Sequence, residues 1–221
     1  MATSREFSKL ILLCPLQFER RALVAAGLEE CCDIVCCGPG DAAGIWVKDN
    51  CATNTNSLLI LAGLGGGLRD SLLASTAHIA SKVIDEQGNS WTPTFKLSEK
   101  ASQATIVSTK HVIVTPEGKR ALAERSGADI VDLESAGFAA AASVNTCHWA
   151  IVRGISDCVD DSLPEDIDQW VDSKGSTKPS AVVASILRKP ALLGDIRKMR
   201  SASITAMQAV SDIIKLMMKS K

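Results

Sequence analysis

The chain has 221 residues, of which 46% are hydrophobic, and its 24 basic and 25 acidic residues give a net charge of −1. Such a chain is long enough to bury a full core, and its balanced charge gives no electrostatic reason to expect nucleic acid or an anionic membrane as partner. The first apolar run, residues 10–13, ends at Cys14 and Pro15. It is too short for a signal peptide or a membrane span, so we expect a cytoplasmic protein.

The eight cysteines are expected to be reduced thiols, because a cytoplasmic protein rarely keeps disulfides. Cys31 and Cys32 are adjacent, as are Cys36 and Cys37, and neither pair has the spacing of a metal-binding CxxC. A buried strand carrying small thiols is the simpler interpretation. The alternative is a metal site in which a helix holds Cys32 and Cys36 one turn apart. We predict no metal.

Short apolar runs alternate with helical patterns along the chain. Strands are predicted at residues 10–14, 57–62, 79–84, 105–107, 129–133 and 149–153. Helices are predicted at residues 17–26, 115–127, 134–144 and, with a break at Pro190, 180–218. Residues 86–101 are rich in loop-forming residues and predict an exposed loop.

Strands separated by helices need crossover connections, which favour a parallel sheet. We therefore predict one α/β domain over residues 1–221, with three layers (α/β/α) and a mainly parallel, mixed central sheet. The apolar stripe of the tail, residues 180–221, is expected to pack on this sheet, and a dimer contact is the alternative.

Ligands of open parallel sheets bind at the carboxyl ends of the strands. Three motifs follow predicted strands there: GLGGGL at residues 63–68, VDLESA at 131–136 and VRGISD at 152–157. The glycines allow either a tight turn or close approach to a ligand. They are not a dinucleotide fingerprint, because GxGxxG would need glycine at Leu68.

Together, in this order and spacing, the motifs resemble the purine nucleoside phosphorylase/nucleosidase superfamily, most of all its methylthioadenosine/S-adenosylhomocysteine nucleosidases. Residues 115–134 and the tail motifs around Trp170 and Lys178 resemble the hopanoid-associated nucleosidase subgroup more loosely. The resemblance implies a nucleoside phosphorylase-like fold.

The resemblance also implies roles for individual residues. Asp157 matches the general acid that protonates N7 of the purine, and Glu19 matches the carboxylate that activates the attacking water. Arg153 matches an arginine beside that water, and Glu134 matches the acid that holds the ribose hydroxyls. The main chain of Ile113 lies near the base. The remaining substrate contacts are expected at Leu133, Val112, Gly65 and Ser156.

This chemistry is physically reasonable, because a purine leaves readily only when a ring nitrogen is protonated, and carboxylates stabilise the cationic sugar. Each residue also has a structural alternative. Glu19 would be a solvated surface glutamate, Asp157 a helix N-cap, Glu134 a carboxylate favouring a helix dipole, and Arg153 an ion-pair partner. Their joint occurrence favours the catalytic interpretation.

Two positions depart from the family pattern. Leu64 stands where such nucleosidases often have a serine that helps to hold the water, and Val112 where an aromatic often stacks on the base. The phosphate-binding positions of the phosphorylases are occupied by Cys14-Pro15, Leu61 and Leu64, and Arg69 lies at the wrong offset to replace them. Hydrolysis is therefore favoured over phosphorolysis.

The sequence thus predicts a hydrolase of a purine nucleoside, with adenine as base and a modified 5′ group that is methylthio, homocysteinyl or a large lipid. The tail and residues 86–101 are expected to select that group. We expect no cofactor and a homodimer. The rivals are a phosphorylase and a non-catalytic binding protein. His148 is expected to pack, and His111 to line the pocket.

Overall fold

The computed structural model describes residues 7–51, 56–145 and 147–219. Its strands are β1 (Lys9–Cys14), β2 (Asp33–Cys36), β3 (Ser57–Gly67), β4 (Ala77–Asp85), β5 (Ser90–Trp91), β6 (Gln103–Ser108), β7 (Ile130–Asp132) and β8 (His148–Asp157). Its α-helices are α1 (Gln17–Ala25), α2 (Ala42–Asn50), α3 (Pro116–Ser126), α4 (Ser135–Val144), α5 (Pro179–Arg188) and α6 (Leu192–Lys219). Two short 3₁₀ helices, η2 (Leu28–Glu30) and η3 (Ile167–Trp170), complete the described elements.

The central sheet is mixed, as predicted. Its strands lie in the order β2-β1-β3-β7-β6-β4-β5, and β8 pairs with both β3 and β4. Parallel pairing joins β1 to β2 and β3, β3 to β8, and β6 to β4 and β7. The β3–β7, β4–β5 and β4–β8 pairs are antiparallel. The pairings close a ring through β3, β8, β4, β6 and β7, so the sheet curls on itself.

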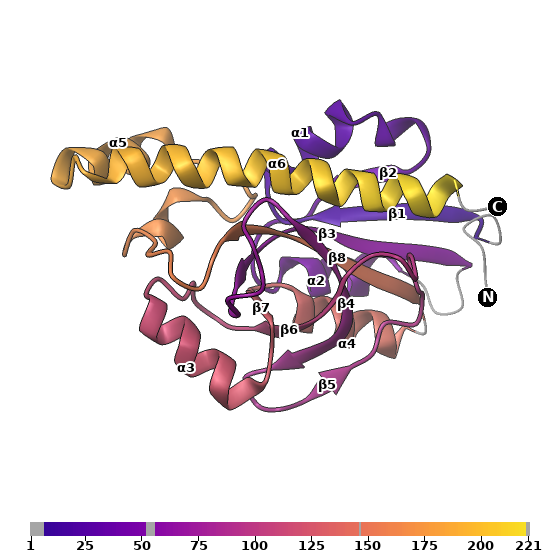
Figure 1. The fold of residues 1–221 in the computed structure, drawn as a ribbon. Helices are drawn as coiled ribbons and strands as arrows, with labels where there is room; N and C mark the ends of the chain where they lie inside the picture. Colours follow the sequence, from indigo (N-terminus) through magenta and orange to yellow (C-terminus); the bar gives the residue numbers. More distant parts are fainter. Residues whose placement is uncertain (1–6, 52–55, 146, 220–221) are drawn as a thin grey trace.

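Helices cover both faces of the sheet (Figure 1). Alternate residues of β1 and β3 point to opposite faces, and both faces are apolar, which is the pattern of strands buried on two sides. Leu12 and Ile60 pack in one core with Met207 and Ile214 of α6. The other core holds α2 and α4, whose side chains pack against Leu59. Among the described residues, no helix has the length and apolarity needed to cross a bilayer.

The predicted helix ends follow their capping residues. Thr115 begins α3 by accepting a hydrogen bond on its side chain from the Gly118 N–H, and Gly127 ends it with a φ of 70°. The tail is helical on both sides of Pro190, as α5 and α6.

Two expectations and one alternative for local structure are wrong. The glycines after residue 62 do not form a turn, because β3 continues through Gly67 and its last residues pair with β7. Residues 86–101 are not simply an exposed loop, because they include β5, and Phe95 and Leu97 are buried in the core. Cys36 lies in the half-buried strand β2, so no helix places it one turn from Cys32.

Candidate active site

A large cavity opens at the carboxyl ends of β1, β3, β7 and β8, where an α/β sheet places its ligands. Its volume is about 990 Å³. All the residues proposed from the sequence for catalysis or binding, except Arg153, line it: Glu19, Gly65, Val112, Ile113, Leu133, Glu134, Ser156 and Asp157. Residues from positions 19 to 157 of the chain therefore meet in one cavity.

Glu19 lies in the first turn of α1 and is only 2% exposed, so it is not a solvated surface glutamate. Its Oε2 accepts a hydrogen bond of 2.8 Å from the N–H of Leu16, and its Oε1 accepts one of 2.8 Å from the N–H of Leu64. Burial raises the pKa of the Glu19 carboxyl to about 7, although Arg153 and these two N–H groups oppose the rise. A carboxyl with this pKa is suited to accept a proton near neutral pH.

Arg153, in the middle of β8, is completely buried beneath the cavity and is held by two carboxylates. Its Nε donates to Asp132 Oδ2 at 2.7 Å, and its Nη2 donates to Glu134 Oε2 at 3.1 Å. Within the described part of the chain, its Nη1 has no hydrogen-bond partner. A buried guanidinium nitrogen without a partner is costly, so this nitrogen marks a position where a ligand or water would bind.

Gly63 leaves space for the side chains of Arg153 and Glu19 to approach each other. A Cβ atom on Gly63 would lie 2.6 Å from Arg153 Nη1 and 2.7 Å from Glu19 Oε1. Both charged groups therefore converge on the same small volume beside the glycine. The glycine motif provides space for buried side chains of the site.

Glu134 is the N-cap residue of α4 and is 6% exposed. Its Oε1 accepts a hydrogen bond of 3.1 Å from the N–H of Gly40, which the sequence did not indicate. Burial, followed by the nearby charges of Asp132 and Glu19, raises the pKa of the Glu134 carboxyl to about 8 against the opposing effect of Arg153. Asp132 also accepts a hydrogen bond of 2.6 Å from Ser108 Oγ.

Asp157 lies at the end of β8 and begins no helix, so the N-cap alternative is wrong. Its Oδ1 accepts a hydrogen bond of 2.6 Å from Ser156 Oγ. Its Oδ2 forms an ion pair of 2.6 Å with Nζ of Lys119, a residue of α3 that the sequence analysis did not single out. One signal was available: Lys119 shares a helix face with Leu122 and Ala123, where an apolar residue is expected.

The walls of the cavity are mainly apolar. Val112, Ile113 and Leu133 line it where the base is expected. Val112 leaves this wall without an aromatic ring, but Phe18 and Trp170 line the cavity from α1 and η3. The tail contributes Val182 of α5 and, from α6, further residues: Ile196, Met199, Arg200 and Ser203.

Other sequence predictions for the cavity are wrong. His111 is not a lining residue: its side chain is 85% exposed. No residue of the segment 86–101 lines the cavity either.

Arg69 approaches Asp129 at 3.6 Å and donates to the carbonyl of Ala123, so it faces α3. His148 packs its ring against Phe7, with ring centroids 5.0 Å apart, as expected. Among the described residues, no group of three potential ligands could hold a metal.

Comparison with known proteins gives two findings. Residues 96–188 match the model of a family described as the Phosphorylase superfamily. None of the curated proteins matches the chain by sequence.

By structure, the chain is similar to a 5′-methylthioadenosine nucleosidase from Arabidopsis thaliana, with 12% identity, 98% of each chain covered and a TM-score of 0.68. It is also similar to an MTA/SAH nucleosidase, with 13% identity, 98% of each chain covered and a TM-score of 0.70. A futalosine hydrolase from Helicobacter pylori strain 26695 matches with 12% identity, 99% of this chain and 100% of the other covered, and a TM-score of 0.67. The predicted fold class and the resemblance to this superfamily are confirmed.

Proposed function

We propose that the protein is a nucleosidase that hydrolyses the N-glycosidic bond of a purine nucleoside, with adenine as base and a modified 5′ group. One observation carries the proposal. The unpartnered Nη1 of Arg153 and Oε1 of Glu19 converge beside Gly63, and Glu19 lines the same cavity as Asp157. A proton acceptor with a buried hydrogen-bond donor beside it thus shares one cavity with a second carboxyl.

The attacking water would lie beside Gly63. Arg153 Nη1 would donate a hydrogen bond to the water oxygen, and Glu19 would accept a proton from it as the oxygen attacks C1′. The Glu19 pKa of about 7 suits this role, because an appreciable fraction of the carboxyl is ionised at neutral pH. Leucine offers no hydroxyl at position 64, and its main-chain N–H orients Glu19.

On the opposite side of the scissile bond, the base would lie against Val112, Ile113 and Leu133. Glu134 would hold the ribose hydroxyls. As the C1′–N9 bond breaks, its electron pair goes to the base, and Asp157 supplies the proton to N7. The sugar then has oxocarbenium character, which the nearby carboxylates stabilise. This reaction needs no metal or organic cofactor.

The structural neighbours support the proposal, since their descriptions name hydrolases of nucleosides: a 5′-methylthioadenosine nucleosidase, an MTA/SAH nucleosidase and a futalosine hydrolase. The cavity volume of about 990 Å³ is at the upper end of the range for small-molecule sites, which favours a nucleoside with a substantial 5′ group.

The phosphorylase alternative shares Asp157 and Glu134 but needs a site for a phosphate dianion. The expected positions hold the buried residues Cys14 and Leu61, together with Leu64. Arg69 faces α3. A purely binding protein would not need a buried glutamate poised near neutrality beside an unpartnered arginine nitrogen, so hydrolysis is the preferred function.

Three expectations about the whole protein remain proposals. Residues 1–221 would form one nucleoside phosphorylase-like domain, in which α6 packs on the sheet through Met207 and Ile214. The protein would be a homodimer, and it would act in the cytoplasm.

The test is an incubation of the purified protein with methylthioadenosine, S-adenosylhomocysteine, adenosine and inosine, with and without phosphate, followed by chromatography of the free base. Release without phosphate from an adenine nucleoside supports the proposal. Release that requires phosphate favours the phosphorylase. No release from any of the four, combined with binding of one of them, favours the binding protein.

A further inference from the structure

Lys119 is a buried lysine that the proposed mechanism does not yet use. It is 0% exposed, and it projects from α3 toward the loop that follows β8. Its Nζ donates to Asp157 Oδ2 at 2.6 Å, to the carbonyl of Cys158 at 2.7 Å and to the carbonyl of Asp161 at 2.9 Å. All three protons of the ammonium therefore have acceptors, and one of them is the proposed general acid.

This geometry is difficult to reconcile with Asp157 acting as the donor by itself. A carboxylate 2.6 Å from a buried ammonium is stabilised in its charged form. The acidic proton of the pair then resides on Lys119, while Asp157 Oδ2 lies near the substrate side, 3.0 Å from where a Cβ atom on Gly66 would be. The oxygen that accepts from Lys119 therefore also faces Gly66, which lines the substrate cavity.

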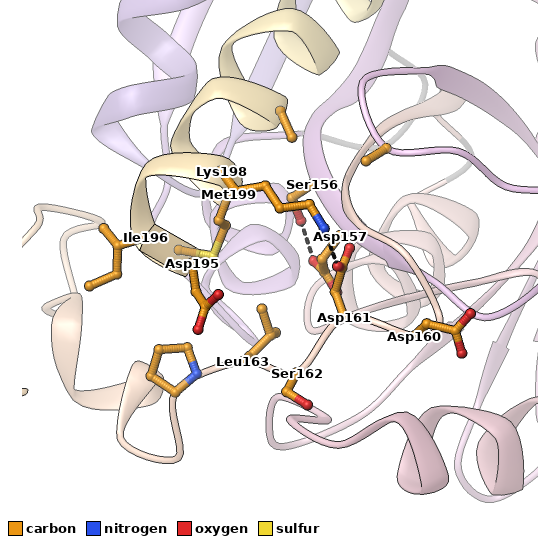
Figure 2. Close-up of a pocket in the computed structure, with 13 residues that line it drawn as sticks. Ser156, Asp157, Asp160, Asp161, Ser162, Leu163, Asp195, Ile196, Lys198 and Met199 are labelled. Atoms are coloured by element: carbon orange, nitrogen blue, oxygen red, sulfur yellow. Dashed lines mark hydrogen bonds and ion pairs between the residues drawn. The ribbon is translucent and has the colours of Figure 1, made fainter. Parts of the chain in front are cut away.

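A second cavity, of about 350 Å³, adjoins Asp157 (Figure 2). Ser156, Asp157 and Leu163 line both cavities. Ile196 and Met199 of α6 also line both, so the two cavities adjoin. The polar part of the second cavity is formed by residues of the loop after β8 and of α6: Asp160, Asp161, Ser162, Asp195 and Lys198. A cavity of this size with these polar groups accommodates several water molecules, which can contact Asp157.

We propose that Lys119 and Asp157 act as one proton-donating unit, in which Asp157 touches the base, Lys119 is a positioning residue that supplies the proton, and solvent that reaches Asp157 restores it. The inference rests on the proposed nucleosidase function. The new element is the origin of the proton that the base receives, which is Lys119.

The proton balance closes over one turnover. As the C1′–N9 bond breaks, N7 takes a proton from Asp157 and Asp157 Oδ2 takes one from Lys119 Nζ, so the carboxylate is restored and the lysine becomes neutral. Glu19 takes the proton of the attacking water and later releases it to solvent. Because Lys119 lines neither cavity, it regains its proton through Asp157, which water in the second cavity can contact. The net reaction consumes one water and yields the neutral base and the free sugar.

The other charged groups near Lys119 and Asp157 have partners of their own. Asp161 accepts a hydrogen bond from the N–H of Cys158 and one of 2.6 Å from Lys198 Nζ of α6. Cys158 accepts on its Sγ from the N–H of Ala74. Asp160 pairs with Arg120 at the surface of α3. Asp161 and Lys198 compensate each other, so Lys119 is the cation that faces Asp157 directly.

Two variants separate proton supply from packing. Lys119→Gln keeps N–H donors but has no charge and no acidic proton, whereas Lys119→Arg keeps the charge but holds its proton much more tightly. The matched control is Lys9→Gln, which removes an exposed lysine that pairs with Asp33 at 2.9 Å. The rate of base release is measured between about pH 6 and 9 on the nucleoside that the wild type hydrolyses fastest, with circular dichroism as the check on folding.

For Lys119→Gln we expect the activity to be lost at least about tenfold more at alkaline than at acid pH, because Asp157 must then carry its own proton. For Lys119→Arg we expect a loss of at least about tenfold at every pH, and for Lys9→Gln no change. Wild-type activity and pH profile in Lys119→Arg would overturn the proposal. A loss in Lys119→Gln that is uniform across pH would also overturn it, since that result indicates a structural role.

A measurement on the wild type covers the case in which the Lys119 variants do not fold. The infrared difference spectrum of wild type minus Asp157→Asn at neutral pH should contain an ionised-carboxylate band. The carbonyl band of a protonated acid would overturn the proposal. If the wild type releases no base from any nucleoside, the nucleosidase function fails, whereas the infrared result still reports on the charge of the pair.

Discussion

The cavity is bounded by two buried charge clusters of different composition. Around Arg153, three carboxylates (Glu19, Asp132 and Glu134) lie near a single guanidinium. At the end of β8, one carboxylate, Asp157, faces one ammonium. The first cluster has an excess of negative charge, and the second is balanced.

The difference shows how one cavity can accept a proton on one side and donate it on the other. In the Arg153 cluster, burial raises the pKa of Glu19 to about 7 and that of Glu134 to about 8, so its carboxylates bind protons near neutrality. In the Asp157 cluster, the carboxylate forms an ion pair of 2.6 Å with the ammonium of Lys119, which we propose as the source of the proton. Environments that differ in this way identify the acid and the base of a site.

The largest expected loss of activity comes from the cluster of Asp157 and Lys119. Asp157→Asn should reduce the rate of base release about a thousandfold, because the amide cannot transfer a proton to N7. The rate is measured by chromatography of the free base, and circular dichroism checks that the variant is folded. Asp212→Asn, at an exposed position of α6, is the control and should lose little activity. A fully active Asp157→Asn would contradict the assignment of the acid.

The Arg153 cluster should make the activity depend on the ionisation of Glu19. Glu19→Gln should lower kcat/KM about a hundredfold, because the water loses its base. In the wild type, kcat/KM should fall as pH decreases below about 7, where Glu19 becomes protonated. In Glu19→Gln this fall of kcat/KM at acid pH should be absent. If the fall persists unchanged in the variant, it reports the ionisation of another group.

The volume beside Gly63, within the Arg153 cluster, is also testable. Gly63→Ala places a methyl group within 2.7 Å of both Arg153 Nη1 and Glu19 Oε1, so it should displace the attacking water and lower the activity about tenfold or more. Gly194→Ala is the matched control, because in α6 the added Cβ meets nothing within 4 Å and alanine favours a helix. Equal activities of the two variants would show that the volume beside Gly63 is not used.

The smallest effect is on stability. Because the pKa of Glu134 rises from an ordinary value of about 4.5 to about 8 on folding, the folded state binds the proton more tightly. This contribution is complete below about pH 4.5 and is lost as pH rises toward 8. Glu134→Gln should therefore raise Tm by a few degrees at alkaline pH relative to the wild type, and by less at acid pH.

Thermal melts across this pH range measure the difference, with the exposed Glu165→Gln as control. A Tm difference between wild type and Glu134→Gln that does not depend on pH would show that the cost of burying this charge is smaller than the structure implies.

Much of the fold was predictable, because long apolar runs such as that of β3 and capping residues such as Thr115 and Gly127 determine structure locally. The helix α2 was not predicted, since its buried face consists of small residues, Ala43, Gly44 and Val47, that give a weak periodic signal. The extension of β3 was missed because glycine usually marks a turn. Pairing of the glycines with β8 and β7, contacts distant in sequence, makes them part of a strand.

For the site, the sequence motifs identified the carboxylates but not their partners. The hydrogen bonds of Glu19 to main-chain groups and the contact of Gly40 with Glu134 depend on tertiary structure. So does the pairing of Lys119 with Asp157, although a lysine on an apolar helix face was a signal that could have been followed.

The most direct test of hydrolysis is to identify the sugar released from an adenine nucleoside in phosphate-containing buffer. Hydrolysis predicts free pentose carrying the intact 5′ group, at a rate that phosphate does not change. A pentose 1-phosphate as the product would contradict it and establish phosphorolysis.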